Sequence, residues 1–288
     1  MIQARNKLSQ EELSEAKNLI NCCQAYDETY RDPYLSNMLN FDTNMPAFFL
    51  YYEKGELVGL LTVYADDPDV ELAILVHPNH RCQGIARALY RSFEKETASY
   101  PIESVTFQTE RIFLERHPDF ASNWGLVEDE ETETWLGKDR RPYPLANVSN
   151  LEVLLADRSY QDQISQLKFQ AFSEDHESRE VVDRYVAKAL KDPESLLYIL
   201  LKNGQVIGTC TVDLSSNTNY LFGLAIAELE RGKGYGTYLA KSLINQLIEQ
   251  NDKAFQIAVE DSNLGAKRLY EKIGFVKQTQ VVYLKPKV

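Results

Sequence analysis

The chain repeats itself once, and this duplication restricts its possible folds more than any other feature. The segment Glu53-Lys-Gly-Glu-Leu-Val-Gly59 returns as Lys202-Asn-Gly-Gln-Val-Ile-Gly208, an offset of 149 residues (204 − 55). Three further pairs of segments keep an offset of 149 or 150: 81–86 with 231–236, 105–110 with 255–260, and 125–126 with 274–275. Short periods build solenoids, whereas a period this long indicates a duplicated domain.

The length agrees with two domains. At 288 residues the chain is about twice as long as a common single domain. Two prolines and a cluster of charges interrupt the pattern in the segment 137–147. We therefore predict one domain at 1–140 and a second at 148–288.

Each copy reads as α+β, with helices flanking a mixed, mostly antiparallel sheet. In the second copy, the dipeptide Asn203-Gly204 suits a tight hairpin between strands at 196–201 and 206–213. A strand at 220–227, a helix at 234–250, a strand at 255–259 and a helix at 263–273 follow. We expect a last strand, Val281–Leu284, to close the sheet of this copy.

Charge and composition narrow the class of protein. The formal net charge of −12 disfavours nucleic acid as a partner and weakly favours a cationic one such as an amine. No apolar run approaches the ~20 residues that span a bilayer, so we expect no membrane partner and a cytoplasmic location. The four cysteines form no C-x-x-C pair and the four histidines no i, i+4 pair, so no metal site is predicted.

A glycine-rich loop in each copy is the most informative local feature. In Arg231-Gly-Lys-Gly234-Tyr-Gly236 the loop follows a strand and opens a helix, whose free N–H groups suit an anion. The loop matches neither the P-loop nor the dinucleotide fingerprint. It resembles the R/Q-x-x-G-x-G/A loop of the GNAT superfamily of N-acetyltransferases, and Val76-His-Pro-Asn-His-Arg81-Cys-Gln-Gly84-Ile-Ala86 resembles the other common form of that loop.

The resemblance covers both copies and implies a tandem member of this superfamily. It implies that the loop amides bind the pyrophosphate of acetyl-coenzyme A (acetyl-CoA) without a metal. The cofactor-binding residues expected from it in the second copy are Ile226, Ala227, Arg231, Gly232, Lys233, Gly234, Tyr235, Gly236 and Thr237. Those expected in the first copy are Val76, Arg81, Cys82, Gln83, Gly84, Ile85 and Ala86.

A second motif distinguishes the copies. The segment from Asn263 to Phe275 resembles the superfamily signature N-x-x-A-x-x-x-Y-x-x-x-G-F. By resemblance, Tyr270 is the general acid for the departing thiolate and Asn263 helps to hold the pantetheine arm. The small Ala266 on the same helix permits close approach to the cofactor. The first copy has Phe120 or Ala121 at the tyrosine position and Pro118 inside the expected helix. We therefore place the better-preserved active site in the second copy.

The general base is harder to choose. By resemblance, a glutamate on the strand before the loop, or a water that it orders, often deprotonates the amine. The first copy offers Asp69 and Glu71 on that strand, whereas the second offers none. Glu260, Asp213 or the Tyr220 hydroxyl would have to serve in the second copy. Our candidate catalytic residues are thus Tyr270, Glu71 and Glu260.

The leading hypothesis is direct acetyl transfer from acetyl-CoA to a primary amine on a small molecule, peptide or protein, by a monomer or homodimer. A non-catalytic acyl-CoA-binding sensor or scaffold is the alternative. A third possibility makes the first copy a substrate-recognition or packing domain for the second. The sequence does not identify the acceptor amine.

Overall fold

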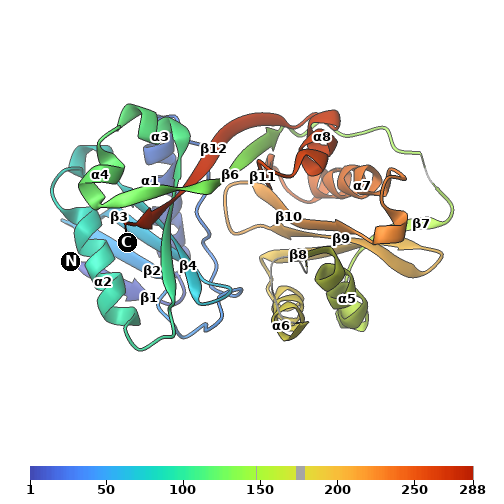
Figure 1. Ribbon diagram of the computed structural model, residues 1–288, viewed down its shortest axis with the longest axis horizontal. Coiled ribbons are helices and arrows are strands. Elements are labelled where there is room, and N and C mark those ends of the chain that lie inside the picture. Colours follow the sequence, from blue (N-terminus) through green and yellow to red (C-terminus); the bar gives the residue numbers. More distant parts are fainter. Residues whose placement is uncertain (147, 173–178, 288) are drawn as a thin grey trace. The chain divides into compact units, whose positions relative to one another are not determined.

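A computed structural model describes residues 1–146, 148–172 and 179–287. It contains two compact units (Figure 1). The first unit comprises Met1–Trp135 and Gln278–Val288, and the second comprises Leu136–Lys277. The predicted ranges, 1–140 and 148–288, differ from this partition at the two ends where strands change unit.

The first unit has an α+β fold built on one sheet. Its strands are β1 (Ile2–Arg5), β2 (Phe48–Glu53), β3 (Glu56–Tyr64), β4 (Asp69–Val76), β5 (Ser104–Glu110), most of β6 (Leu126–Lys138) and most of β12 (Val276–Pro286). Its helices are α1 (Gln10–Asp27), α2 (Ile85–Thr97), α3 (Arg111–Arg116) and α4 (Phe120–Trp124), with a 3₁₀ turn at Pro78–His80. The strand order is β1-β2-β3-β4-β5-β12-β6.

The second unit repeats this plan. Its strands are β7 (Leu151–Leu155), β8 (Ser195–Lys202), β9 (Gln205–Asp213), β10 (Asn219–Ile226) and β11 (Phe255–Glu260), in the order β11-β10-β9-β8-β7. Its helices are α5 (Gln161–Phe172), α6 (Arg179–Ala189), α7 (Tyr235–Gln250) and α8 (Leu264–Lys272), with 3₁₀ turns at Arg158–Tyr160 and Glu228–Glu230. Figure 1 shows α5 and α6 on one face of this sheet and α7 and α8 on the other.

The sequence signals for these elements are confirmed. Both hairpin dipeptides have positive φ at both residues, 51° and 88° at Lys54-Gly55 and 50° and 79° at Asn203-Gly204. Such a turn matches the twist of the flanking strands. Pro118 separates α3 from α4, as expected from its missing N–H. The sheets are mixed and mostly antiparallel, because only β4–β5 and β10–β11 are parallel among the pairs with a described register.

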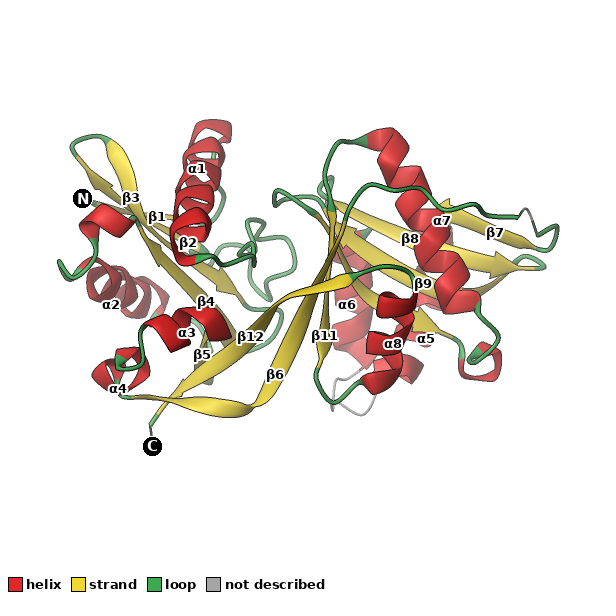
Figure 2. Cartoon of the chain, turned by 90° about the horizontal axis from the view of Figure 1, so that it is seen from above, coloured by secondary structure: helices red, strands yellow, loops and turns green. Residues whose placement is uncertain are grey.

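The expectation for the last strand is wrong. Val281–Leu284 does not close the second sheet, because β12 pairs antiparallel with β5, with Val281 opposite Glu110 and Leu284 opposite Phe107. β12 thus enters the first unit, while the end of β6 from Leu136 onward belongs to the second (Figure 2). Burial explains the exchange: Val282 and Leu284 lie in the first core, and Leu136 lies in the second.

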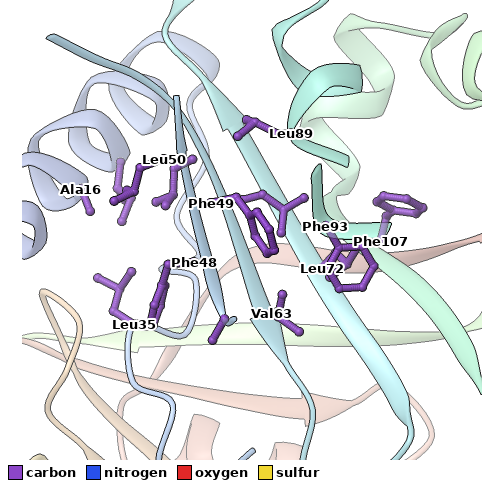
Figure 3. Close-up of a cluster of buried hydrophobic side chains, with 14 of the residues drawn as sticks. Ala16, Leu35, Phe48, Phe49, Leu50, Val63, Leu72, Leu89, Phe93 and Phe107 are labelled. Atoms are coloured by element: carbon purple, nitrogen blue, oxygen red, sulfur yellow. The ribbon is translucent and has the colours of Figure 1, made fainter. Parts of the chain in front are cut away.

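The first core is a continuous apolar cluster on both faces of its sheet. Ala16 of α1 and Leu89 and Phe93 of α2 pack with strand residues including Phe49 and Leu72 (Figure 3). Phe49 and Phe93 meet edge to face, with ring centroids 6.0 Å apart. This packing fixes β4, which carries the loop described below.

Leu284→Ala will destabilise the first unit although the residue lies four positions from the C-terminus. Deleting a fully buried leucine side chain costs ~2–5 kcal/mol. Trp124 and Trp135, the two tryptophans of the chain, both belong to the first unit, so their fluorescence reports its unfolding. The denaturation midpoint from tryptophan fluorescence should fall in Leu284→Ala. It should fall much less in Leu243→Ala, a matched change in the second core; equal shifts would contradict the assignment of β12.

Candidate functional site

In each unit, two neighbouring strands run parallel and then separate. The register of β4 with β5 ends at Leu72 opposite Phe107, although β4 continues to Val76. The register of β10 with β11 ends at Leu221 opposite Ile257, although β10 continues to Ile226. Backbone groups that leave a ladder need other partners, so each separation can receive a polar ligand chain.

The glycine loop of the first unit follows β4 directly. Cys82 and Gly84 both have positive φ, 58° and 83°, and Gly84 caps the N-terminus of α2. No atom lies within 4 Å of where a Cβ on Gly84 would stand, so the glycine serves the backbone conformation and leaves the helix N-terminus open. An exposed cysteine in this conformation is a strained position of the kind that clusters at functional sites.

The arginine of this loop anchors it to α1. The Arg81 guanidinium donates two hydrogen bonds to the Asp27 carboxylate, at 2.7 and 2.6 Å, and a third to the Val76 carbonyl at 3.0 Å. It also lies 5.3 Å from the centroid of the Tyr26 ring. The Arg81 side chain, predicted to bind the cofactor, therefore holds the shape of the loop through these bonds.

The second unit holds its loop differently. Gly232 and Gly234 have φ of 75° and 85° at the positions of Cys82 and Gly84. The Arg231 side chain keeps the bond to the strand, from Nε to the Ile226 carbonyl at 3.0 Å, and is exposed. Lys233 forms an ion pair of 3.1 Å with Glu230, which also binds Lys202 at 2.9 Å. The Lys233 ammonium is therefore held beside the Glu230 carboxylate.

A cavity of about 720 Å³ lies in the first unit, along the separation of β4 and β5. Its lining contains six of the seven predicted binding residues of this copy, Gln83 being the exception: Val76, Arg81, Cys82, Gly84, Ile85 and Ala86. Arg87, Arg116 and His117 add basic groups, and Phe107, Phe113, Phe120 and Trp124 form an apolar wall. Basic groups at a helix N-terminus beside an apolar trough suit a phosphate-bearing ligand with a flexible arm.

Glu71 does not line this cavity itself but is hydrogen-bonded to a residue that does. The cavity reaches Arg31, Gln108 and Thr109, and the Gln108 side-chain amide donates a hydrogen bond to the Glu71 carboxylate. Burial raises the pKa of Glu71 to about 7, against the opposing charge of Arg31 and together with the carboxylate of Glu133. A carboxylate with a pKa near neutrality can accept a proton at physiological pH.

The second-unit candidates occupy less open positions. Tyr270 is only 6% exposed and packs in the core against Phe275, with ring centroids 6.0 Å apart; burial raises its pKa. Asn263 caps α8, its Oδ1 accepting from the Ala266 N–H at 3.0 Å, so this oxygen is already engaged. Glu260 is exposed at the end of β11 and accepts a hydrogen bond from Ser262 at 3.3 Å.

The other predicted residues of the second loop have structural contacts. Lys202 lies 5.1 Å from the centroid of the Tyr235 ring. Gly236 begins the first turn of α7, and a Cβ there would stand 3.0 Å from Leu269. Ile226, Ala227 and Thr237 flank the loop and are half-buried.

Sequence reasoning missed Asp27, Arg31 and Gln108. Asp27 comes from α1, 54 residues before Arg81, and no spacing rule links them. Gln108 stands on β5 directly across from the end of the β4 ladder, and a strand alignment of Glu71 with Thr106 would have brought it close.

Comparison with known proteins agrees with this geometry. The acetyltransferase (GNAT) family model matches residues 13–137 and again residues 161–275. The chain belongs to the GNAT family. Its predicted class, an N-acetyltransferase built from two tandem domains, is confirmed by this membership. Members of the family generally use acetyl-CoA and act on amines.

Individual relatives are distant. The chain is 25% identical over 230 residues to a mycothiol acetyltransferase of Clavibacter sepedonicus, covering 76% of this chain and 73% of that one. Its fold is similar to a GCN5-related N-acetyltransferase from Sphaerobacter thermophilus, with a TM-score of 0.70 at 16% identity over 100% of this chain and 96% of that chain. It is also similar to a tandem GNAT protein from the clavulanic acid biosynthesis pathway, with a TM-score of 0.69 at 15% identity over 99% and 97%. The structural likenesses show the fold.

Among residues 1–146, 148–172 and 179–287, no helix is both long and apolar enough to cross a bilayer. The same residues hold no group of three histidine, cysteine or acidic side chains suited to a metal ion.

Acetyl-CoA should protect Cys82 from alkylation. Cys82 is exposed in the first loop, whereas Cys23 and Cys210 are buried and their pKa values are raised to about 12 by burial. Iodoacetamide should therefore modify Cys82 well before those two, as read by peptide mass mapping. Saturating acetyl-CoA should slow modification at Cys82 at least tenfold and leave Cys22 unaffected; an unchanged rate at Cys82 would remove the first loop from the binding site.

Proposed function

We propose that this protein transfers the acetyl group of acetyl-CoA directly to a primary amine, and that the reaction centre lies in the cavity of the first unit. The observation that carries the proposal is the run of the cavity from the loop at Arg81–Ala86 to Gln108, the partner of Glu71. This differs from the sequence-based choice of the second copy, which rested on the Asn263–Tyr270 helix.

The residues present fit acetyl-CoA. The loop amides and the N-terminus of α2 receive the pyrophosphate, and Arg87 and Arg116 lie close enough to the loop to line the same cavity. The separated strands receive the pantetheine arm and its thioester. The thioester of acetyl-CoA supplies an activated acyl carbon. The protein holds that carbon in place and provides the group that accepts the proton.

Glu71 is the proposed base. An alkylammonium with a pKa of ~10.4 is deprotonated in only about one molecule in a few thousand at neutral pH, so a base beside it increases the reactive fraction. The Gln108 amide, which lines the cavity, holds the carboxylate by a hydrogen bond. The neutral amine then attacks the thioester carbon, the C–S bond breaks, and the thiolate leaves.

Direct attack is favoured over an acyl-cysteine intermediate. Cys23 lines the cavity, but burial raises its pKa to about 12, so little nucleophilic thiolate exists at neutral pH. Cys82 lies in the proposed pyrophosphate loop, whereas Gln108 lies on β5. The acceptor is an amine, and free thiol release with a panel of polyamines, amino acids, aminoglycosides and peptides would identify it.

A second candidate function applies to the second unit. The buried position of Tyr270 favours an acyl-CoA-binding module without turnover of external amines, which is the sensor or scaffold alternative. Within that unit Tyr270 remains the proposed acid for a departing thiolate, because its hydroxyl keeps its proton at neutral pH.

Glu71→Gln should lower kcat/KM for amine acetylation by ~10²- to 10⁴-fold, the usual contribution of a positioned base. In the wild type, kcat/KM should fall about tenfold per pH unit below the Glu71 pKa of about 7, because the carboxylate is then protonated. The rate of free thiol release measures kcat/KM in the variant and at each pH in the wild type. Asp69→Asn, an exposed carboxylate on the same strand, is the matched control and should retain activity. An unchanged pH profile in Glu71→Gln would refute the assignment.

Stability gives an independent check on Glu71. Its folded pKa is raised from 4.5 to about 7, so the folded state holds the proton more tightly than the unfolded state between those values. The stability of the wild type therefore falls as pH rises through this window. Glu71→Gln should raise Tm at pH 8 and leave it nearly unchanged at pH 4; the reverse order would contradict the buried position.

A matched pair of loop variants separates the two units. Cys82 and Gly232 hold equivalent positions with positive φ, which aspartate tolerates, and an aspartate there repels a pyrophosphate. Cys82→Asp should abolish turnover of external amines, whereas Gly232→Asp should retain it. The opposite result would return the reaction centre to the second copy.

A further inference from the structure

A lysine is buried inside the second unit beside the separated strands. Lys168 of α5 is only 5% exposed, and its Nζ lies 3.4 Å from both the Thr211 Oγ1 and the Gly223 carbonyl. It also lies 5.3 Å from the centroid of the Tyr185 ring. Burying a long cationic side chain is costly, so its position calls for a reason.

The first unit has an apolar residue at this place. The buried positions of α1 and α5 superimpose at an offset of 148: Ala16 with Ile164, Leu19 with Leu167, and Ile20 with Lys168 (168 − 20). Ile20 is 1% exposed. The duplicated helices therefore share their packing, and the second one places an amine where the first has a hydrocarbon side chain.

The backbone of β10 is shaped around this amine. The ladder of β10 with β9 shifts register between Phe222 and Ala225, and Gly223 there has a φ of 58°. A Cβ on Gly223 would stand 2.6 Å from the Lys168 Nζ, so any larger residue would push the amine from its present place, and the φ of 58° itself favours glycine. The equivalent residue of the first unit, Ala73, sits in a regular ladder opposite Thr62. The bulge and the glycine together admit the lysine.

The amine lies where a bound thioester would end. Gly223 comes two residues after Leu221, the last residue of β10 in the parallel ladder. From Gly223 to the start of the loop after Ile226 is about 10 Å of strand. A pantetheine arm, comparable to about four residues of extended chain, covers that distance. An arm whose pyrophosphate lies at Arg231–Gly236 thus brings its acyl carbon to Lys168.

Tyr270 belongs to the same neighbourhood. Tyr270 and Cys210 belong to one buried cluster, and the Cys210 Sγ lies 3.7 Å from the Phe222 carbonyl at the bulge of β10. The next residue of β9, Thr211, makes the contact with Lys168. The proton donor and the amine therefore belong to elements that pack around the same stretch of β9 and β10.

We propose that Lys168 is a self-acetylation site, modified once by acetyl-CoA bound to the second loop. The neutral Nζ attacks the thioester carbon, an N–C bond forms, the C–S bond breaks, and Tyr270 gives the leaving thiolate a proton that it regains from the amine. A second proton of the original ammonium passes to solvent. The products are N-acetyllysine, the coenzyme A thiol and one proton.

This proposal depends on the proposed function only in that the second loop binds acetyl-CoA; it does not require turnover in the first unit. Acetylation replaces a buried charge by a neutral amide, which is cheaper to bury. A single turnover then fills the acyl site of the second unit with its own product. External amines are left to the first unit.

Peptide mass mapping after incubation with acetyl-CoA tests the proposal. Lys168 should gain one acetyl group per chain, with a first-order rate that is independent of protein concentration. Exposed lysines such as Lys95, whose side chain is 82% exposed, serve as internal controls for uncatalysed acetylation. A buried lysine should react last by the uncatalysed route, so acetylation of Lys168 ahead of Lys95 is the diagnostic result.

The loop variants and a tyrosine variant supply the controls. Gly232→Asp should prevent acetylation of Lys168, Cys82→Asp should leave it unchanged, and Tyr270→Phe should slow it by ~10²-fold or more. Lys168→Arg keeps the charge, removes the acceptor amine and should retain turnover of external amines. Lys168 that stays unmodified at saturating acetyl-CoA, or that reacts equally in Gly232→Asp, overturns the proposal. Failure of amine turnover alone in the wild type would instead count against the function assigned to the first unit.

Discussion

Both candidate sites depend on one constraint, which is that two adjacent parallel strands stop pairing before they end. A parallel ladder needs slanted, evenly spaced bonds, and where the strands diverge those backbone groups become available to a ligand. In the first unit the divergence begins after Leu72 and Phe107, and the cavity follows it. In the second it begins after Leu221, where the bulge of β10 follows at once. The strand separation forms the opening of each site, and the glycine loop and the helix after it form one end of that site.

Duplication preserved this scaffold and changed the groups that face the opening. The first unit fastens its loop through Arg81 and Asp27, keeps a regular β4 and places Glu71 beside Gln108. The second unit ties its loop to its own strand through Arg231 and, by way of Glu230, to Lys202 of β8. It also bends β10 and inserts Lys168. The first opening is lined by Gln108, whose partner is the Glu71 carboxylate. The corresponding region of the second unit contains the buried amine of Lys168.

The sequence was sufficient for the elements and for the loops, because turn glycines and apolar periodicity are local signals. The family resemblance also proposed Glu71 from its place on the strand before the loop, and this role stays a prediction. Three features could not be read this way. The exchange of β6 and β12 depends on which core buries Leu136 and Leu284, and an alternating strand pattern does not name its partner. The burial of Tyr270 depends on the packing of α8. The insertion of Lys168 depends on a backbone bulge that no motif announces.

The exchanged C-terminal strand also sets the order in which the molecule can be completed during synthesis. β12 pairs with β5 across a separation of 171 residues in sequence (281 − 110), and it lies between β5 and β6 in the first sheet. Residues 1–135 leave the ribosome before the second unit but lack an internal strand until β12 emerges after it. The unit that is translated first is therefore finished last, and its unpaired strand edges must persist throughout translation of the second.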